Sequence, residues 1–180
     1  MHDLRAILRS ATADDHRRTE DSFAANFAAF PDSYGSFLEA HARAFPAIGR
    51  ALSCGLDWQP WHDRWHALES DLADLDRHTP SALNAAPAAS RAEAIGMAYV
   101  LEGSRLGSTV LLQRVPAGLP TAYLRGGKDR APWQRLLALL ETVDPSDEMA
   151  AIAGARLAFR TFRAAAEHGG EAVLAQMAHA

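Results

Sequence analysis

His16 and Glu20 are the residues of this 180-residue chain whose types and spacing point most clearly to chemistry. On a helix their side chains lie one turn apart, so the Glu20 carboxylate can accept the Nδ1 proton of His16 and leave Nε2 free and basic. A histidine that binds a metal usually donates the hydrogen of its other ring nitrogen to a carboxylate in this way. A half-buried histidine with a surface partner has the same spacing, and from spacing alone it is the more common case.

A second unusual feature is a set of small residues on one helical face. Gly96, Gly103 and Gly107 are seven and four residues apart, and Ser104 and Ser108 flank them. Each glycine costs about 1 kcal/mol relative to alanine in a helix, so three on one face need a reason. Close helix packing is one reason, and the close approach of a flat ligand to the helix backbone is the other.

A flat, metal-bearing ligand held between His16 and the glycines would explain both features, and haem fits that description. Its propionates would need cations at the rim of the site. Arg9 lies seven residues before His16 on the same edge of the first helix, and Arg135 is a candidate on another helix. Each arginine taken alone is more simply a solvated surface charge.

His62 and His66 are also one turn apart, and Glu69 follows three residues after His66. The pair could bind a metal, but the tryptophans and leucines of the same segment define its buried face and leave both histidines beside or outside that face. The chain has no Glu-x-x-His pair of the di-iron kind. We therefore interpret the two histidines as part of a solvated face.

The elements that must position these residues are predicted to be helices throughout. Alanine accounts for 38 of the 180 residues, which favours helix and argues against a sandwich or barrel. Apolar residues recur at helical spacing, without convincing strand alternation. We expect one all-α domain over residues 1–180, a bundle of about seven helices.

The boundaries of the expected helices follow from caps and breakers. Ser90 and Glu93 fit a capping box, and Asp144-Pro145 fits a cap followed by a first helical residue. Loops are expected at 54–60, 78–89 and 116–132. The expected helices cover residues 3–28, a stretch from the Phe30-Pro31-Asp32 break to about 53 with a kink at Pro46, 61–77, 90–115, 133–143 and 145–167, with a short tail helix after Gly169-Gly170.

Charge and cysteine content exclude several classes of function. The net charge is −4, so no general attraction to nucleic acid or to an anionic membrane is expected. Cys54 is the single cysteine, which excludes an intrachain disulfide and a cysteine-based zinc site. The N-terminus lacks an apolar signal core and no apolar run is long enough to span a membrane, which predicts a cytoplasmic protein.

Two segments resemble the haem oxygenase family. The run L-R-S-A-T-x-x-x-H-x-x-x-E at 8–20 is similar to the helix that carries the proximal iron ligand. The run Y-V-L-E-G-S-x-L-G at 99–107 is similar to the distal helix of the bacterial, biliverdin-forming branch often associated with bacteriophytochromes. Shorter matches follow that order: D-L-x-x-L at 71–75, Trp133, and A-x-x-x-F-x-x-F at 155–162. The resemblance covers about residues 4–165.

The resemblance implies a set of binding residues. His16 would be the proximal iron ligand and Glu20 its hydrogen-bond partner. Arg9 and Arg135 match positions where the family places propionate-binding cations, and Tyr123 is a further expected pocket residue. The two arginines would set the in-plane rotation of the haem, and with it the meso carbon that is attacked.

The resemblance also assigns the distal face. Gly103 and Gly107 would let the helix backbone lie over the haem and O₂. The family usually has a second glycine directly after the position of Gly107, where this chain has Ser108. Many members carry an aspartate that organises water where this chain has Ser104, so the water network would rest on backbone carbonyls and Arg105. These departures bear on rate and regiochemistry more than on binding.

The implied reaction opens haem to biliverdin, CO and ferrous iron, with O₂ and electrons from an external reductase, since the chain has no redox centre or nucleotide fingerprint of its own. The resemblance to the phytochrome-associated branch makes a bacteriophytochrome one candidate receiver of biliverdin, and the sequence does not decide between chromophore supply and iron acquisition. One rival is a haem-binding carrier or sensor without efficient turnover, which Ser108 supports. Another is a metal-free enzyme similar to the thiaminase-like branch of this architecture, disfavoured because Cys54 falls in an expected loop.

Overall fold

The structure, a computed structural model, describes residues 3–28, 33–59 and 61–177, with side chains described except at 25–28, 127 and 169–177. Within these ranges every regular element is a helix, which confirms the predicted all-α fold. The α-helices are α1 (Leu4–Ala11), α2 (Ala13–Ala28), α3 (Tyr34–Ser53), α4 (His62–Asp74), α5 (Arg91–Leu111), α6 (Ala122–Arg125), α7 (Ala131–Leu140) and α8 (Glu148–Met177). Three short 3₁₀ helices accompany them: η1 (Leu112–Arg114), η2 (Gly126–Lys128) and η3 (Pro145–Asp147).

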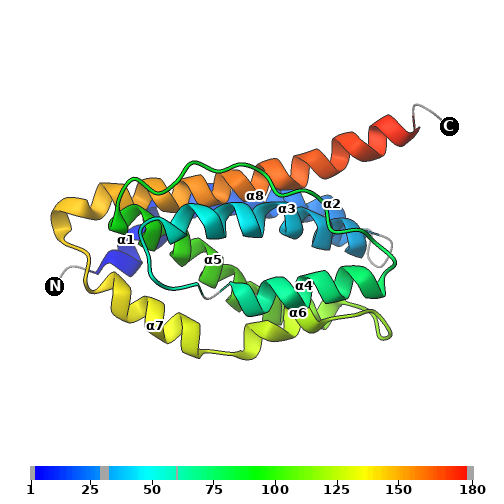
Figure 1. The fold of residues 1–180 in the computed structure, drawn as a ribbon, viewed down its shortest axis with the longest axis horizontal. Coiled ribbons are helices and arrows are strands. Elements are labelled where there is room, and N and C mark those ends of the chain that lie inside the picture. Colours follow the sequence, from blue (N-terminus) through cyan, green and yellow to red (C-terminus); the bar gives the residue numbers. More distant parts are fainter. Residues whose placement is uncertain (1–2, 29–32, 60, 178–180) are drawn as a thin grey trace.

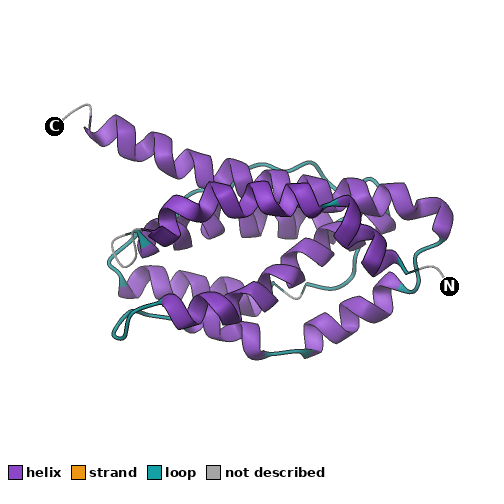
Figure 2. Ribbon diagram, turned by 180° about the vertical axis from the view of Figure 1, so that it is seen from behind, coloured by secondary structure: helices purple, strands orange, loops and turns teal. Residues whose placement is uncertain are grey.

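The bundle is built around α5 and α8 (Figure 1). Helices α2 and α3 pack along α8, α6 and α7 pack against α5, and α4 packs between α3 and α6. The view from behind shows the same layers, with the last turns of α8 extending past the other helices (Figure 2). No helix in the described ranges has an apolar stretch of the length needed to cross a bilayer.

Glycines of α5 and α8 let the backbones of these two helices approach each other closely. A Cβ added to Gly96 would collide with the carbonyl group of Ala151, and one added to Gly154 would collide with the carbonyl group of Glu93. Real side chains do not tolerate such contacts with backbone atoms, so only glycine allows the two helices to lie this close. At this level of the bundle the glycines serve packing.

The expected first helix, 3–28, is divided into α1 and α2 at Thr12. The Thr12 hydroxyl donates to the carbonyl oxygen of Leu8 at 2.7 Å, and the Thr12 N–H donates to the same oxygen at 3.0 Å. The His16 N–H then donates to the Thr12 oxygen at 2.9 Å. A threonine hydroxyl competes in this way for helix carbonyls, and the break lets α2 begin one turn before His16.

A helix that was not predicted, α6, lies inside the expected loop 116–132. Its N-terminus is capped from another helix, because the Asp71 carboxylate accepts hydrogen bonds from the N–H groups of Ala122 and Tyr123, both at 2.9 Å. The Tyr34 hydroxyl donates to the Pro120 oxygen at 2.9 Å just before it. Caps supplied from distant positions leave no local signal, which explains the wrong prediction.

Two predicted helix ends were also wrong. Helix α8 continues through Gly169 and Gly170 to Met177, since glycine raises the free energy of a helix by only about 1 kcal/mol and does not end it. Helix α4 ends at Asp74, and Asp76 has φ +55, which turns the chain out of the helix. The predicted break at 30–32 lies outside the described residues.

Two predicted caps are present. The Ser90 Oγ accepts from the Glu93 N–H at 3.1 Å, although the Glu93 carboxylate reaches the Ala89 N–H at 2.7 Å rather than that of Ser90. The Asp144 Oδ1 accepts from the Ser146 N–H at 2.8 Å and starts η3, which leads into α8. These caps place the starts of the two central helices where the sequence predicted them.

Candidate functional site

A cavity of about 1150 Å³ lies between α2 and the second half of α5. Its walls are His16 and neighbouring residues of α2 on one side and the stretch from Tyr99 to Leu111 on the other. Phe37 of α3 and Phe159 of α8 contribute to the lining between them. The cavity therefore brings together the two segments whose patterns suggested chemistry.

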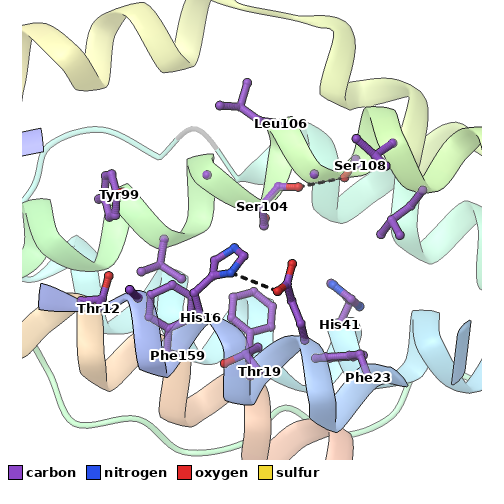
Figure 3. Close-up of a pocket in the computed structure, with 18 of the residues that line it drawn as sticks. Thr12, His16, Thr19, Phe23, His41, Tyr99, Ser104, Leu106, Ser108 and Phe159 are labelled. Atoms are coloured by element: carbon purple, nitrogen blue, oxygen red, sulfur yellow. Dashed lines mark hydrogen bonds and ion pairs between the residues drawn. The ribbon is translucent and has the colours of Figure 1, made fainter. Parts of the chain in front are cut away.

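The His16 side chain stands in this cavity and faces Ser104 of α5 (Figure 3). Its Nδ1 lies 3.4 Å from the Glu20 Oε2, and the two side chains are 61% and 67% exposed. The ring also packs edge-on against Phe159, with centroids 5.7 Å apart. The pairing with Glu20 leaves Nε2 available to a ligand.

The donor set around His16 restricts which metal it can hold. Among the described residues no group of three or more histidine, cysteine, aspartate or glutamate side chains is arranged to bind an ion. A protein metal site normally needs three or four such ligands. A single exposed nitrogen fits a metal that brings its equatorial ligands with it, as the iron of haem does.

The opposite wall has the open space that a flat ligand requires. A Cβ added to Gly103 or to Gly107 would meet nothing within 4 Å. These two glycines therefore do not serve helix packing, unlike Gly96 on the same face of α5. Their backbone borders the cavity directly, across from His16.

Ser104 and Ser108 are held by a buried arginine that the sequence reasoning missed. The Arg64 Nη1 donates to the Ser104 Oγ at 2.9 Å, and Nη2 donates to the Ser108 Oγ at 3.2 Å. The guanidinium carbon lies 4.7 Å from the ring centres of Phe45 and Tyr123. Ser108 is 2% exposed, so its hydroxyl is turned into this cluster although the residue lines the cavity.

Arg64 carries a buried charge with no carboxylate bonded to it in the described part of the chain. The carboxylate of the neighbouring Glu102 is bound by Arg105, at 2.7 Å from Nε and 3.2 Å from Nη2. Burial lowers the pKa of Arg64, and the charge of Arg105 lowers it further. Arg105 also donates to the Gly126 oxygen at 3.0 Å and does not line the cavity, contrary to its expected place in a distal water network.

Cations border the cavity at the rim near Tyr99. Arg5 and Arg9 both line it, and the Arg5 guanidinium lies 5.6 Å from the ring centre of Trp133. Burial raises the pKa of Tyr99, while the charges of Arg5 and Arg9 act in the opposite direction. Sequence reasoning predicted Arg9 at this rim and missed Arg5, whose position depends on the contact with Trp133.

Arg135 and Tyr123 do not line the cavity. The Arg135 guanidinium lies over the Trp58 ring, 5.3 Å from its centre. Tyr123 is 1% exposed, and burial raises its pKa to about 12. Tyr123 packs against Arg64 and against the ring of His41, whose centroid is 5.4 Å away, so it contacts the site through these two side chains.

His41 is a second histidine on the cavity wall, and the sequence reasoning did not select it. Its Nδ1 lies 2.9 Å from the Phe37 oxygen, and its ring contacts Phe23 and Phe37 at 5.0 and 4.2 Å. Burial lowers the pKa of His41 to about 3, so the ring is neutral. The bond to Phe37 makes Nδ1 the donor and Nε2 an acceptor. The phenylalanines one turn to either side on α3 were the available signal.

His62 and His66 have exposed side chains, as predicted for a solvated face. The Nδ1 of His66 lies 3.4 Å from Glu69 Oε2, and the His62 ring packs against that of Trp61 at 4.4 Å. Neither histidine lines the cavity.

The chain is similar to proteins named for haem chemistry. A curated protein of Xanthomonas campestris pv. campestris (strain 8004), "Heme oxygenase", is 34% identical over 145 residues, which cover 73% of this chain and 87% of that protein. The NO- and CO-bound heme oxygenase from Neisseria meningitidis superposes with a TM-score of 0.70 at 20% identity, over 92% of this chain and 91% of that chain. The second likeness shows the fold alone. No family model matches the chain.

Proposed function

Since this chain belongs to the haem oxygenase family, we propose that it binds one haem between α2 and α5 and opens it to biliverdin, CO and ferrous iron. O₂ and electrons from an external reductase are the co-reactants. The observation that carries the proposal is the pairing of an available His16 Nε2 with empty space in front of Gly103 and Gly107. One wall offers an iron ligand, and the other leaves space for a planar ligand.

His16 would hold the iron, and Glu20 would hold His16. At 3.4 Å from Nδ1, the carboxylate would favour the tautomer in which Nδ1 carries the proton, so that Nε2 would keep its lone pair for the metal. The edge-on contact with Phe159 limits rotation of the ring. When bound, haem supplies both the redox-active iron and the macrocycle that is oxidised.

The second half of α5 would cover the other face of the haem. With hydrogen in place of a side chain at Gly103 and Gly107, the helix backbone would border the ligand directly. Ser104 is held by Arg64 and by its own bond to the Leu101 oxygen at 2.7 Å. The buried positive charge of Arg64 behind these serines favours negative charge on this side of the cavity.

The carboxylates of haem would be held at the rim by Arg9, Arg5 and Tyr99. A charge-assisted hydrogen bond at an exposed rim contributes about 1 kcal/mol or less. Arg135, which the resemblance suggested for this role, lies over Trp58 and is left out of the proposal.

The alternative of a haem carrier without turnover rested on Ser108. In the structure its hydroxyl is bonded to Arg64 and to the Ser104 oxygen, at 3.2 and 3.1 Å, rather than pointing freely at the ligand space. The thiaminase-like alternative needs a nucleophile in the cavity, and Cys54 is exposed at the end of α3, outside the cavity lining. Neither alternative gains an observation in its favour.

Reconstitution with haemin followed by reduction in air tests the proposal. We expect a Soret band at one haem per chain, and then its replacement by the broad red absorption of biliverdin when ascorbate or a reductase is added. His66→Ala, an exposed histidine outside the cavity, is the matched control for His16→Ala. A stable haem complex that yields no biliverdin with any reductant would indicate the carrier instead.

A further inference from the structure

The first turn of α2, which leads into His16, is tied to α8 by ion pairs that lie outside the cavity lining. The Asp15 carboxylate lies 3.6 Å from the Arg156 Nε and 3.3 Å from the Arg163 Nη1. Arg156 also donates to the Ala11 oxygen at 3.2 Å, and Arg163 donates to the Asp15 backbone oxygen at 3.3 Å. The two arginines therefore hold both sides of the break between α1 and α2.

The same face of α8 also contacts the imidazole of His16. Arg156, Phe159 and Arg163 are three and four residues apart, so their side chains lie on one side of the helix. The two arginines are separated by two turns, or about 10 Å. Phe159 lies between them and packs edge-on against the His16 ring (Figure 3). One surface of α8 thus binds Asp15 and supports the side chain of the next residue.

The aspartate next to Asp15 makes no such contact. Asp14 and Asp15 both lie in the first turn of α2, where negative charge interacts favourably with the helix N-terminus. The Asp14 carboxylate pairs with Arg17 of the same helix at 2.8 Å, and its side chain is 73% exposed. The Asp15 side chain is 20% exposed. Of the two aspartates, only Asp15 forms an ion pair with another helix among the described residues.

The break at Thr12 makes the position of α2 depend on contacts outside it. Because α2 does not continue α1, no unbroken helix fixes where His16 stands. Apolar contacts such as that with Phe159 resist separation of the helices, but burial is not directional and permits sliding. A carboxylate held between two guanidinium groups resists sliding, because a shift toward one group lengthens the distance to the other.

We propose, resting on the proposed function above, that Asp15 is a positioning residue for the iron ligand. Its pairs with Arg156 and Arg163 hold the first turn of α2 at the position along α8 from which the His16 Nε2 meets the iron. Asp15 acts through the backbone that it shares with His16 and does not touch the haem. Without the pairs, the turn occupies a wider range of positions and only a fraction of the chains present His16 correctly. The apparent haem affinity falls in proportion to that fraction.

Asp15→Asn tests this inference, with Asp14→Asn as the matched control. Both substitutions remove one negative charge from the same helical turn, and only the first breaks ion pairs with α8. In the apoprotein, we expect the protection of the backbone amides of residues 16–19 against hydrogen exchange to fall severalfold in Asp15→Asn and to stay parental in Asp14→Asn.

Haem affinity gives the second measurement. One exposed ion pair changes an equilibrium constant by up to about fivefold, so the loss of two partly buried pairs should lower the affinity on the order of tenfold. Asp15→Glu keeps the charge and should restore most of the affinity. Arg163→Ala should weaken haem binding in the parent and have a smaller effect in the Asp15→Asn background, because the two residues act as a pair.

Resonance Raman spectroscopy separates positioning from general stability. The iron–histidine stretching band of the ferrous complex should broaden in Asp15→Asn, because His16 then meets the iron over a range of angles. The band should keep its parental width in Asp14→Asn.

Three results would overturn this inference while leaving haem binding by His16 intact. The first is parental amide protection in Asp15→Asn. The second is a loss of protection that leaves both the haem affinity and the band width unchanged, which would make the ion pairs purely structural. The third is an equal effect of Asp14→Asn, which would assign the effect to charge at the helix N-terminus. A parent chain that binds no haem would overturn the proposed function as well.

Discussion

The two halves of α5 use the same residue on the same helical face for opposite purposes. In the first half Gly96 lies against the backbone of α8, where an added Cβ would strike the Ala151 carbonyl. In the second half Gly103 and Gly107 face open space. Helices α5 and α8 meet in the first half and separate along the second (Figure 1). A glycine on a helix face therefore reports a close approach, and only the opposing surface shows whether another helix or a ligand makes it.

The largest effect is expected from Gly107→Leu, in the second half of α5. The leucine side chain would occupy the space over the haem, and we expect turnover to fall on the order of hundredfold, as when a reacting group is displaced from its place. Folding should be unaffected or slightly improved, because leucine is the better helix former. Biliverdin formation and thermal unfolding measured on the same sample separate the two effects. Turnover at the parental rate would show that this glycine does not border the ligand.

A matched pair of alanine substitutions sharpens the comparison in the apoprotein. Gly96→Ala places a methyl group against backbone and should lower the free energy of unfolding by about 1–3 kcal/mol. Gly103→Ala meets nothing and should raise it by up to about 1 kcal/mol. Urea unfolding of the two variants shows whether the free energy of unfolding falls or rises in each. If the two shifts have the same sign, the distinction between the halves of α5 is wrong.

The buried histidine of the cavity, His41, gives a pH-dependent test. His41 is 8% exposed and its pKa is lowered to about 3 by burial, so the unfolded chain takes up a proton near pH 6.5 while the folded chain does not. Its contribution to stability is complete above pH 6.5 and is lost as the pH falls toward 3. We expect a loss on the order of 1 kcal/mol between pH 6.5 and 5.

The control for this prediction is His41→Leu, which cannot titrate. Denaturant unfolding at several pH values should give a shallower dependence in the variant than in the parent over this window. Equal slopes in the two proteins would contradict the burial of a neutral His41. The difference between them isolates His41, since other groups titrate in both proteins.

The smallest expected effect is that of Arg64→Met. Replacing a buried charge that has no bonded carboxylate by an apolar chain of similar length is often close to neutral, so the free energy of unfolding should change by less than about 1 kcal/mol. Ser104 and Ser108 keep their hydrogen bonds to helix carbonyls at 2.7 and 3.1 Å but lose the hydrogen bonds that Arg64 of α4 donates to them. We expect turnover to fall severalfold in a reductase-coupled assay. A large loss of stability with unchanged turnover would assign Arg64 a purely structural role.

Local patterns in the sequence were sufficient for part of this account. Alanine content and helical spacing predicted the all-α fold, and the His16–Glu20 spacing predicted a pairing that the structure contains. The glycine face was recognised, but its division at Gly96 was not, because the division depends on α8, more than fifty residues away along the chain.

Contacts between distant segments account for what was missed. Arg64 approaches Ser104 from α4, and Asp71 caps α6 across a similar separation. Arg135 was predicted at the rim from the family resemblance, but its guanidinium lies over Trp58. A long side chain on a surface helix has several surfaces within reach, and the sequence alone does not rank them.

The central claim is that the His16 Nε2 binds the iron of haem, and resonance Raman spectroscopy of the ferrous complex tests it most directly. We predict an iron–histidine stretching band in the parent that is absent from His16→Ala and returns when imidazole is added to that variant. Glu20→Gln should keep the band at lower frequency, since a neutral amide draws the Nδ1 proton less strongly than a carboxylate. An unchanged band in His16→Ala without imidazole would contradict the account.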